Sequence, residues 1–84
     1  MTRYTVVWHQ EAHDELARLW LEAPDRNAMG LAANAIDRHL AGDASEKGIA
    51  VPDGLRQLTI SPLRVIFAVS EPDRMVKILV VARW

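Results

Sequence analysis

Three apolar, β-branched runs in the last third of the chain constrain its fold more than any other feature. They span residues 55–60, 63–69 and 75–82, and the two breaks between them are Ser61-Pro62 and the EPDR segment at 71–74. Runs rich in valine, isoleucine and leucine favour strands, whereas proline beside small polar or acidic residues favours turns. The sequence therefore predicts a three-stranded antiparallel meander in this part of the chain.

Charge is divided unevenly between this stretch and the rest of the chain. Residues 54–84 carry five basic and two acidic side chains, a formal charge of +3, whereas residues 1–53 carry five basic and nine acidic side chains, a charge of −4. The formal net charge of −1 hides this polarity. That net charge is low for an RNA-binding protein, so any RNA or acidic partner would have to meet the basic part.

The upstream part contains a short strand pattern followed by two helical patterns. Residues 4–8, YTVVW, are β-formers. From Gln10 apolar side chains recur at helical spacing until Pro24 ends the pattern. A second helix is expected to begin after Asp25 as its cap and to end with Gly42 in the C′ position. The apolar stripes are Ala12, Leu16, Leu19, Trp20 and Ala23 in the first helix, and Met29, Ala32, Ala33, Ile36 and Leu40 in the second.

These patterns predict one α+β domain over residues 1–84. Residues 42–54 are rich in glycine and small polar residues and are expected to form a loop. The resulting order is β-α-α-β-β-β, with a helical hairpin packed on one face of a small antiparallel sheet. Half of the residues are apolar, and so small a chain buries only about 60–65% of its surface. We therefore expect a protein partner or a homodimer interface to cover the surplus apolar surface.

Strand alternation assigns side chains to the two faces of the predicted sheet. The uniformly apolar rows are Leu63, Val65, Phe67 and Val69 in one strand, and Val76, Ile78, Val80 and Ala82 in the next. If the helices cover these rows, Arg64, Lys77 and Arg83 share the helix-free face. Arg56 has the parity of residues expected to be buried, although its long side chain can reach water from the start of a strand.

The order of elements and the C-terminal motif together resemble the RelE/ParE superfamily of type II toxin–antitoxin toxins. The matching residues are GLRQL at 54–58, SPLRVIF at 61–67 and a hydrophobic final strand that ends in VVAR at 80–83. Leu63 stands where the family usually has tyrosine, and Thr59 where many members have a basic residue. The resemblance implies a small cytoplasmic bacterial toxin with the RelE-like fold, neutralised by a cognate antitoxin.

The resemblance also implies alternative targets. In the RelE branch, basic residues on the concave sheet face cleave messenger RNA in the ribosomal A site. Arg64 matches the strand arginine of that set and Arg83 the basic residue that closes the last strand, with Arg56 as a looser match. In the ParE branch the catalytic residues are absent and the target is DNA gyrase. A third alternative is a non-toxic member that survives as an antitoxin-binding module.

RNA cleavage by a 2′-hydroxyl needs a proton acceptor, cations for the developing phosphorane charge and a proton donor. Arginine meets the second need, because its charged fork makes paired hydrogen bonds to phosphate. Arg64 and Arg83 are therefore the candidate catalytic residues of an mRNA endoribonuclease. Arg56, Lys77 and Trp84 are candidate RNA-binding residues, the last by stacking on a base. Inhibition of translation by ribosome-dependent mRNA cleavage is therefore the leading expectation, and gyrase inhibition stays open as an alternative because only Lys77 remains as a proton carrier.

Other features indicate structural roles. The chain has no cysteine, which excludes disulfides and fits a reducing cytosol. No window of about 18 apolar residues is present, so we expect a soluble cytoplasmic protein. The HQEAH segment at 9–13 is superficially similar to a zincin motif, but its glutamate is one place late and no third ligand follows. We expect neither a metal nor a cofactor, and we expect Trp8 and Trp20 to be core or interface anchors.

Overall fold

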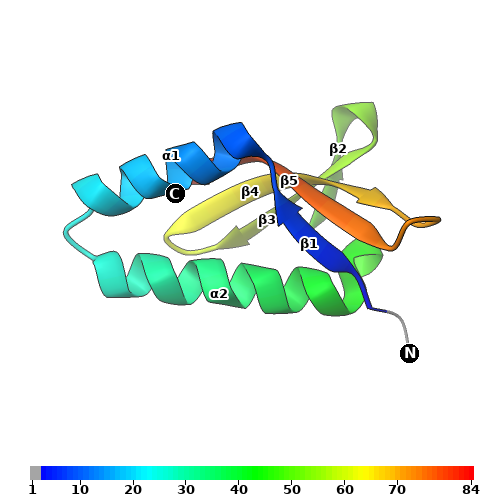
Figure 1. Cartoon of the computed structure of the whole chain (residues 1–84), viewed down its shortest axis with the longest axis horizontal. Helices are drawn as coiled ribbons and strands as arrows, with labels where there is room; N and C mark the ends of the chain where they lie inside the picture. Colours follow the sequence, from blue (N-terminus) through cyan, green and yellow to red (C-terminus); the bar gives the residue numbers. More distant parts are fainter. Residues whose placement is uncertain (1–2) are drawn as a thin grey trace.

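The computed structural model of the chain describes residues 3–84, in which two helices lie on one face of a five-stranded sheet (Figure 1). The strand order is β1-β5-β4-β3-β2. The helices and strands are β1 (Thr5–Trp8), α1 (Gln10–Glu22), α2 (Arg26–Asp43), β2 (Ile49–Val51), β3 (Leu55–Ile60), β4 (Leu63–Ser70) and β5 (Met75–Arg83). Two short 3-10 helices, Ala44–Glu46 and Pro52–Gly54, flank β2.

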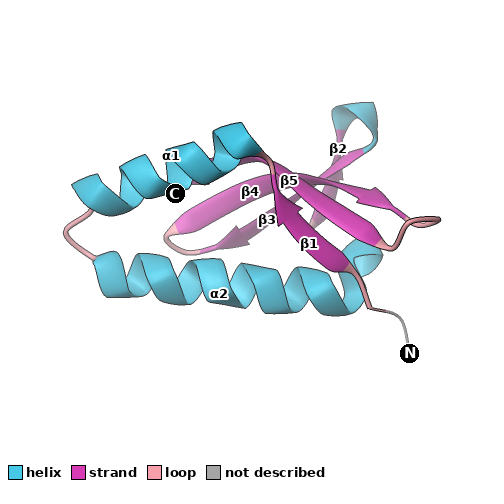
Figure 2. Cartoon of the chain, viewed as in Figure 1, coloured by secondary structure: helices cyan, strands magenta, loops and turns pink. Residues whose placement is uncertain are grey.

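The predicted fold class is confirmed, with a helical hairpin on one face of a small sheet (Figure 2). Strands β3, β4 and β5 form the predicted antiparallel meander. The sheet is mixed because β1 pairs in parallel with β5, which places Trp8 opposite Ile78. A parallel neighbour needs a long crossover connection, and the chain between β1 and β5 contains both helices.

The segment at 42–54, expected to be a loop, also contains the edge strand β2, which pairs antiparallel with β3. Gly48 leads the chain into β2 with a φ of +67°, and a Cβ there would lie 2.0 Å from the carbonyl oxygen of Gln57. Glycine is the residue that tolerates both this backbone conformation and so close an approach. A strand of three residues is too short to show an alternating pattern, which is why the sequence does not reveal it.

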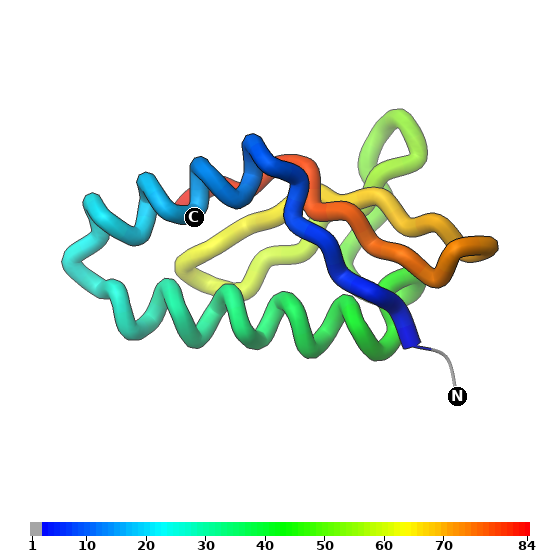
Figure 3. The backbone as a smooth tube through the Cα atoms, viewed as in Figure 1, coloured from blue at the N-terminus to red at the C-terminus, as the bar shows by residue number. Residues whose placement is uncertain are grey.

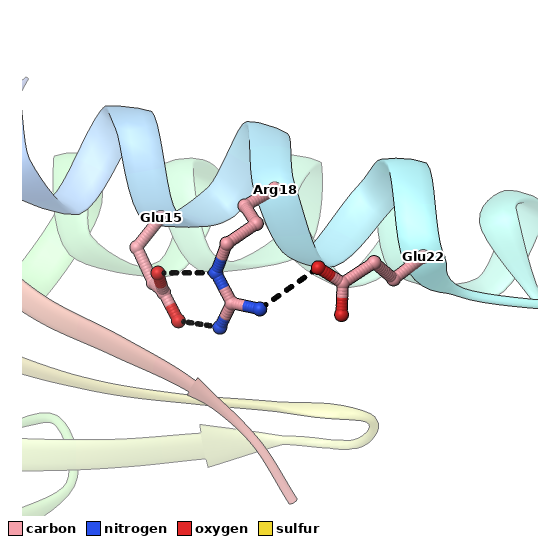
Figure 4. A network of polar contacts seen from close by, with 3 residues as sticks. All are labelled: Glu15, Arg18 and Glu22. Atoms are coloured by element: carbon pink, nitrogen blue, oxygen red, sulfur yellow. Dashed lines mark hydrogen bonds and ion pairs between the residues drawn. The ribbon is translucent and has the colours of Figure 1, made fainter.

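Helix α1 follows the predicted stripe, with Leu16 and Leu19 packed against the core. On its outer side Arg18 bridges two carboxylates in neighbouring turns (Figure 4). The Arg18 Nε donates to Glu15 Oε1 at 2.9 Å, and Nη1 donates to Glu22 Oε2 at 2.9 Å. The hydrogen bond from Arg18 holds the pKa of the Glu15 carboxyl below its usual value. Such spacings of three and four residues support the helix locally.

Helix α2 supplies most of the helical side of the core. Its buried side chains are Met29, Ala32, Ile36 and Leu40, and they face the buried strand residues Leu63, Val65, Phe67, Val76 and Ile78. The expected C′ position of Gly42 is wrong, because α2 continues through Asp43. The backbone of Ala44 stays in the right-handed helical region and leads into a 3-10 helix, so the chain needs no left-handed glycine there.

A bulge in β5 reverses the faces of its last residues. Phe67 lies opposite Ile78 and Ile66 lies opposite Val80, which leaves Leu79 without a partner on β4. An extra residue in one strand shifts the alternation by one place. As a result Val81 is buried, at 3% exposure, whereas Val80 is 49% exposed. The predicted placement of Val80 and Ala82 under the helices is therefore wrong.

Candidate functional site

We call the helix-free side of the sheet the open face. The bulge and the register together decide which side chains lie on it. They form four rungs across the strands: Thr59, Arg64 and Ala82; Ile49, Gln57, Ile66 and Val80; Ala68, Lys77 and Val7; and Ser70, Met75 and Thr5. The rungs are mostly apolar or uncharged, and they carry two cations. The open face therefore offers apolar contact area with two separated positive charges.

Arg64 lies on the open face, as predicted, and its guanidinium stacks on the Trp84 ring with its Cζ 4.2 Å from the ring centroid. The backbone N–H of Trp84 donates to the carbonyl oxygen of Pro62 at 2.8 Å, which fixes the start of the Trp84 side chain. Trp84 remains 67% exposed. A cation held against an exposed aromatic ring can contact a phosphate or carboxylate with the guanidinium and an apolar or π surface with the ring.

Lys77 also lies on the open face, as predicted, beside a hollow of about 280 Å³ lined in part by Ala68, Ser70 and Asp73. Its partner on β4 is Ala68, four residues along the strand from Arg64. Four residues of a strand span about 13 Å. The backbone positions of Arg64 and Lys77 are therefore about 13 Å apart, and the Arg64 guanidinium lies over Trp84, so this arrangement suits contacts with two different groups of a ligand.

Arg83 does not lie on the open face, which corrects the prediction. It pairs with the buried Leu63 on the helix side of the sheet because of the bulge. Its Nη1 donates to Asp25 Oδ1 at 2.8 Å and lies 3.8 Å from the Met29 sulfur. The hydrogen bond from Arg83 lowers the pKa of the Asp25 carboxyl. Asp25 stands at the N-cap of α2, as predicted, but makes no side-chain bond to its own helix.

Arg56 lies on the helix side as well, opposite Phe67. Its Nε donates to the carbonyl oxygen of Lys47 at 2.8 Å, and its Nη2 donates to the carbonyl oxygen of Gly48 at 3.1 Å. These bonds hold the segment before β2 against the start of β3. The structure therefore separates the five predicted site residues: Arg64, Lys77 and Trp84 belong to the open face, and Arg56 and Arg83 do not.

The four rungs of the open face carry no histidine, tyrosine, aspartate or glutamate. The one tyrosine, Tyr4, is buried, and its hydroxyl donates to Glu71 Oε1 at 3.0 Å. His13 and His39 lie on the helices. Apart from Arg64, Lys77 is thus the one ionisable side chain on these rungs, and its backbone lies about 13 Å along the sheet from that of Arg64.

A second surface feature lies on the helical hairpin. The groove between α1 and α2 has a volume of about 470 Å³ and is lined mainly by apolar side chains, among them Leu16, Trp20, Met29 and Ala33. The sequence predicted Trp20 as a core or interface anchor, and it is 42% exposed at the groove. The exposed apolar surface of the chain is therefore divided between two sites.

Within residues 3–84 there is no group of three histidine, cysteine, aspartate or glutamate side chains placed to hold a metal ion. Neither helix of the described chain is long and apolar enough to cross a membrane.

The sequence matches no protein-family model and no curated protein. Several solved structures share its fold. The toxin–antitoxin complex RelBE2 from Mycobacterium tuberculosis has a TM-score of 0.78 at 18% identity, over 100% of this chain and 94% of that chain. The chromosomal ParDE toxin–antitoxin system of P. aeruginosa has a TM-score of 0.67 at 18% identity, over 96% of both chains. E. coli toxin RelE in the free state has a TM-score of 0.69 at 13% identity, over 98% of this chain and 84% of that chain. The chain therefore has the RelE/ParE toxin fold.

Proposed function

We propose that this protein is the toxin of a type II toxin–antitoxin pair. The shared fold supports the proposal, since the similar structures include toxin–antitoxin complexes of both the RelBE and ParDE kinds. The open face supports it too, because its apolar rungs and two cations suit an amphipathic protein segment with acidic side chains. The antitoxin would cover Ile66 and Val80 with apolar side chains and would place carboxylates near Arg64 and Lys77.

We infer that the toxin acts by binding its target rather than by cutting RNA. One observation carries this inference: the rungs around Arg64 hold no acid–base pair, and Arg83 is bonded to Asp25 on the other side of the sheet. Phosphodiester cleavage needs a proton acceptor and a proton donor at the same phosphate that the cations stabilise. A ParE-like block of DNA gyrase needs only a binding surface, so it is the function that the geometry favours.

The second candidate is cleavage of messenger RNA on the ribosome. The stack of Arg64 on Trp84 favours it, because an arginine can hold a phosphate while the exposed ring stacks on an unpaired base. In this mechanism Lys77, whose backbone lies about 13 Å along the sheet from that of Arg64, would have to transfer the protons, unless ribosomal groups take that role.

The test is induced expression without the antitoxin, with growth, transcript ends and plasmid supercoiling followed in the same culture. A double variant, Arg64→Gln with Lys77→Gln, removes both charges of the open face. Its matched control, Arg18→Gln with Arg38→Gln, removes two charges from the exposed sides of the helices. We expect growth arrest with loss of supercoiling for the parent and the control, and little arrest for the open-face variant.

Other outcomes separate the alternatives. Arrest with transcripts cut at new 5′ ends would replace gyrase inhibition by RNA cleavage. Arrest by the open-face variant as strong as that of the parent would show that a different surface meets the target. No arrest by any of the chains at matched expression would favour the non-toxic binding module.

A further inference from the structure

Two adjacent residues at the end of β5 reach opposite sides of the sheet. Arg83 points to the helix side, where its Nη1 donates to Asp25 Oδ1 at 2.8 Å. Trp84 follows directly and lies on the open face, where the Arg64 Cζ is 4.2 Å from its ring centroid. Neighbouring side chains of an extended chain point in opposite directions. The backbone between Arg83 and Trp84 therefore links the helical hairpin to the Arg64–Trp84 stack.

The backbone of Trp84 is held at the end of the sheet. The ladder between β4 and β5 ends at the pair of Leu63 and Arg83. One backbone hydrogen bond lies beyond that pair, from the Trp84 N–H to the Pro62 carbonyl oxygen at 2.8 Å. The Trp84 side chain is 67% exposed. Strand ends with few buried contacts open and close with free energies near zero, so the position of Trp84 is sensitive to weak interactions.

The ion pair between Asp25 and Arg83 has a strength that matters at such a position. Its side chains are 37% and 43% exposed, and an exposed ion pair shifts an equilibrium by at most about fivefold. That shift is small beside the equilibrium of global folding. It is large for a strand end whose closed and open states have similar populations. The pair also acts at the right residue, because Arg83 is the last residue of the ladder and directly precedes Trp84.

Helix α2 does not use the Asp25 side chain as a cap. An N-cap aspartate normally accepts a hydrogen bond from its own helix, but Asp25 makes no such bond. Its carboxylate bonds to Arg83 instead, and the guanidinium lies 3.8 Å from the sulfur of the buried Met29. The residue at the start of α2 thus anchors the end of β5.

We propose that Asp25 and Arg83 are positioning residues of the open face, because their ion pair on the helix side holds the end of β5 so that the Trp84 ring stays against Arg64. The role of this positioning in activity rests on the proposed function, in which the stack belongs to the surface that meets the target. When the ion pair is absent, the strand end opens more often and fewer molecules have the stack. A ligand that needs the stack then binds more weakly in proportion to that fraction.

Three variants isolate the ion pair. Asp25→Asn and Arg83→Gln each remove it, and asparagine is as good an N-cap as aspartate, so the start of α2 is preserved. Glu22→Gln is the matched control, because it removes an exposed carboxylate from a different ion pair, the one with Arg18. All three changes remove one charge and keep a side chain of similar size.

NMR relaxation of the tryptophan indole N–H groups tests the geometry in the chain without a partner. The chain has three tryptophans, and the indole of Trp8, which donates to Asp37 Oδ1 at 2.9 Å, supplies the reference signal. In both ion-pair variants we expect the order parameter of the Trp84 indole to fall by roughly 0.2, with Trp8 unchanged. An unchanged Trp84 signal in these variants, or an equal fall in the control, would overturn the proposal.

Combining the two changes tests whether Asp25 acts through Arg83. The double variant, Asp25→Asn with Arg83→Gln, should mobilise Trp84 no more than either single change does, because each of them already removes the whole pair. Effects on the Trp84 order parameter that add in the double variant would show that the two residues act separately, which would also overturn the proposal.

Growth arrest on induction separates a failure of this proposal from a failure of the proposed function. If the parent does not arrest growth, the proposed function fails, and the Trp84 signal still decides whether the ion pair positions the ring. If the parent arrests growth, Asp25→Asn should need about two- to fivefold more expressed protein for the same arrest. Arrest by Asp25→Asn at the parental level with a mobile Trp84 would overturn the role in activity. Stronger arrest than the parent would overturn it too, because the ion pair would then withhold Arg83 from the target.

Discussion

At the scale of single residues, the ion pair between Asp25 and Arg83 decides how many charges the open face presents. Arg83 comes from the last residue of β5, and its guanidinium lies at the N-terminal end of α2. A helix N-terminus carries partial positive charge, so a cation there is unfavourable unless an anion offsets it. Asp25 is that anion, and it also fixes the end of β5 beside the helical hairpin (Figure 3). The open face is left with Arg64 and Lys77.

Asp25→Asn should lower stability slightly, and the effect should depend on pH. The pKa of the Asp25 carboxyl is lowered in the folded state by Arg83. Its stabilisation is therefore complete above the unfolded pKa of about 3.9 and is lost as pH falls through the lower folded value. Urea unfolding of parent and variant should differ at pH 7 and converge near pH 2. A difference that is the same at both pH values would mean that the side chain acts through packing rather than charge.

The Arg64–Trp84 stack should be measurable as a coupling. A double-mutant cycle with Arg64→Ala and Trp84→Ala isolates the interaction of the two side chains from their other contacts. For an exposed pair at this distance we expect about 0.5–1 kcal/mol in the free energy of unfolding. Trp84→Phe keeps a ring and should retain part of the coupling. If the changes in the free energy of unfolding of the two single variants add up to that of the double variant, the two side chains do not interact, which would contradict a stack in solution.

At the scale of elements, the sequence predicts the parts whose causes are local. The three long strands are bounded by turn residues, and the helical stripes end at Pro24, so the bounds agree to within about a residue or two. The parallel pairing of β1 with β5 joins residues about 70 positions apart, and no local pattern signals it. Strand β2 depends on the close approach of Gly48 to Gln57, which becomes apparent only when β3 is in place.

Replacing the glycines at the two ends of the α2–β2 connection with alanine should change the free energy of unfolding in opposite directions. Gly48→Ala puts a Cβ at a positive φ and against the backbone of Gln57, so we expect a loss of about 2 kcal/mol or more. Gly42→Ala lies within α2 with nothing near the new methyl group, and should stabilise by roughly 0.5–1 kcal/mol. Chemical denaturation of both variants measures the contrast. If Gly48→Ala and Gly42→Ala changed the free energy of unfolding equally, Gly48 would not hold β2 closely against β3.

At the scale of the whole molecule, two surfaces lie on opposite sides of the sheet. The open face holds the cations Arg64 and Lys77, and the hairpin face holds the groove at Trp20 and the exposed Leu31. A small domain that leaves apolar area on both sides is suited to more than one protein contact. One surface can then bind the proposed antitoxin or target while the other remains exposed for a further protein contact.

The candidate site could be predicted only where strand alternation is unbroken. Arg64 lies on β4, whose alternation is unbroken, and Lys77 lies on β5 before the bulge, so parity places both correctly. Arg83 follows Leu79, the extra residue of the bulge, and parity fails for it. The sequence of a strand composed of valines and leucines does not reveal a bulge, because these residues occur on both faces of the sheet. The ion pair with Asp25 joins residues 58 positions apart, and the sequence pattern gives no sign of it.

The two cations of the open face should govern how fast and how tightly the cognate antitoxin binds. Arg64→Gln with Lys77→Gln removes the charges that we expect acidic antitoxin side chains to meet, so the association rate should fall and the dissociation constant should rise about 10–100-fold at low salt. At 0.5 M salt exposed charges are screened within a few ångströms. The difference in antitoxin dissociation constant between parent and variant should therefore be smaller than at low salt. Arg18→Gln with Arg38→Gln removes the same charge from the helices and should bind the antitoxin nearly as the parent does. Equal loss in both double variants would indicate that overall charge, and not the open face, attracts the antitoxin.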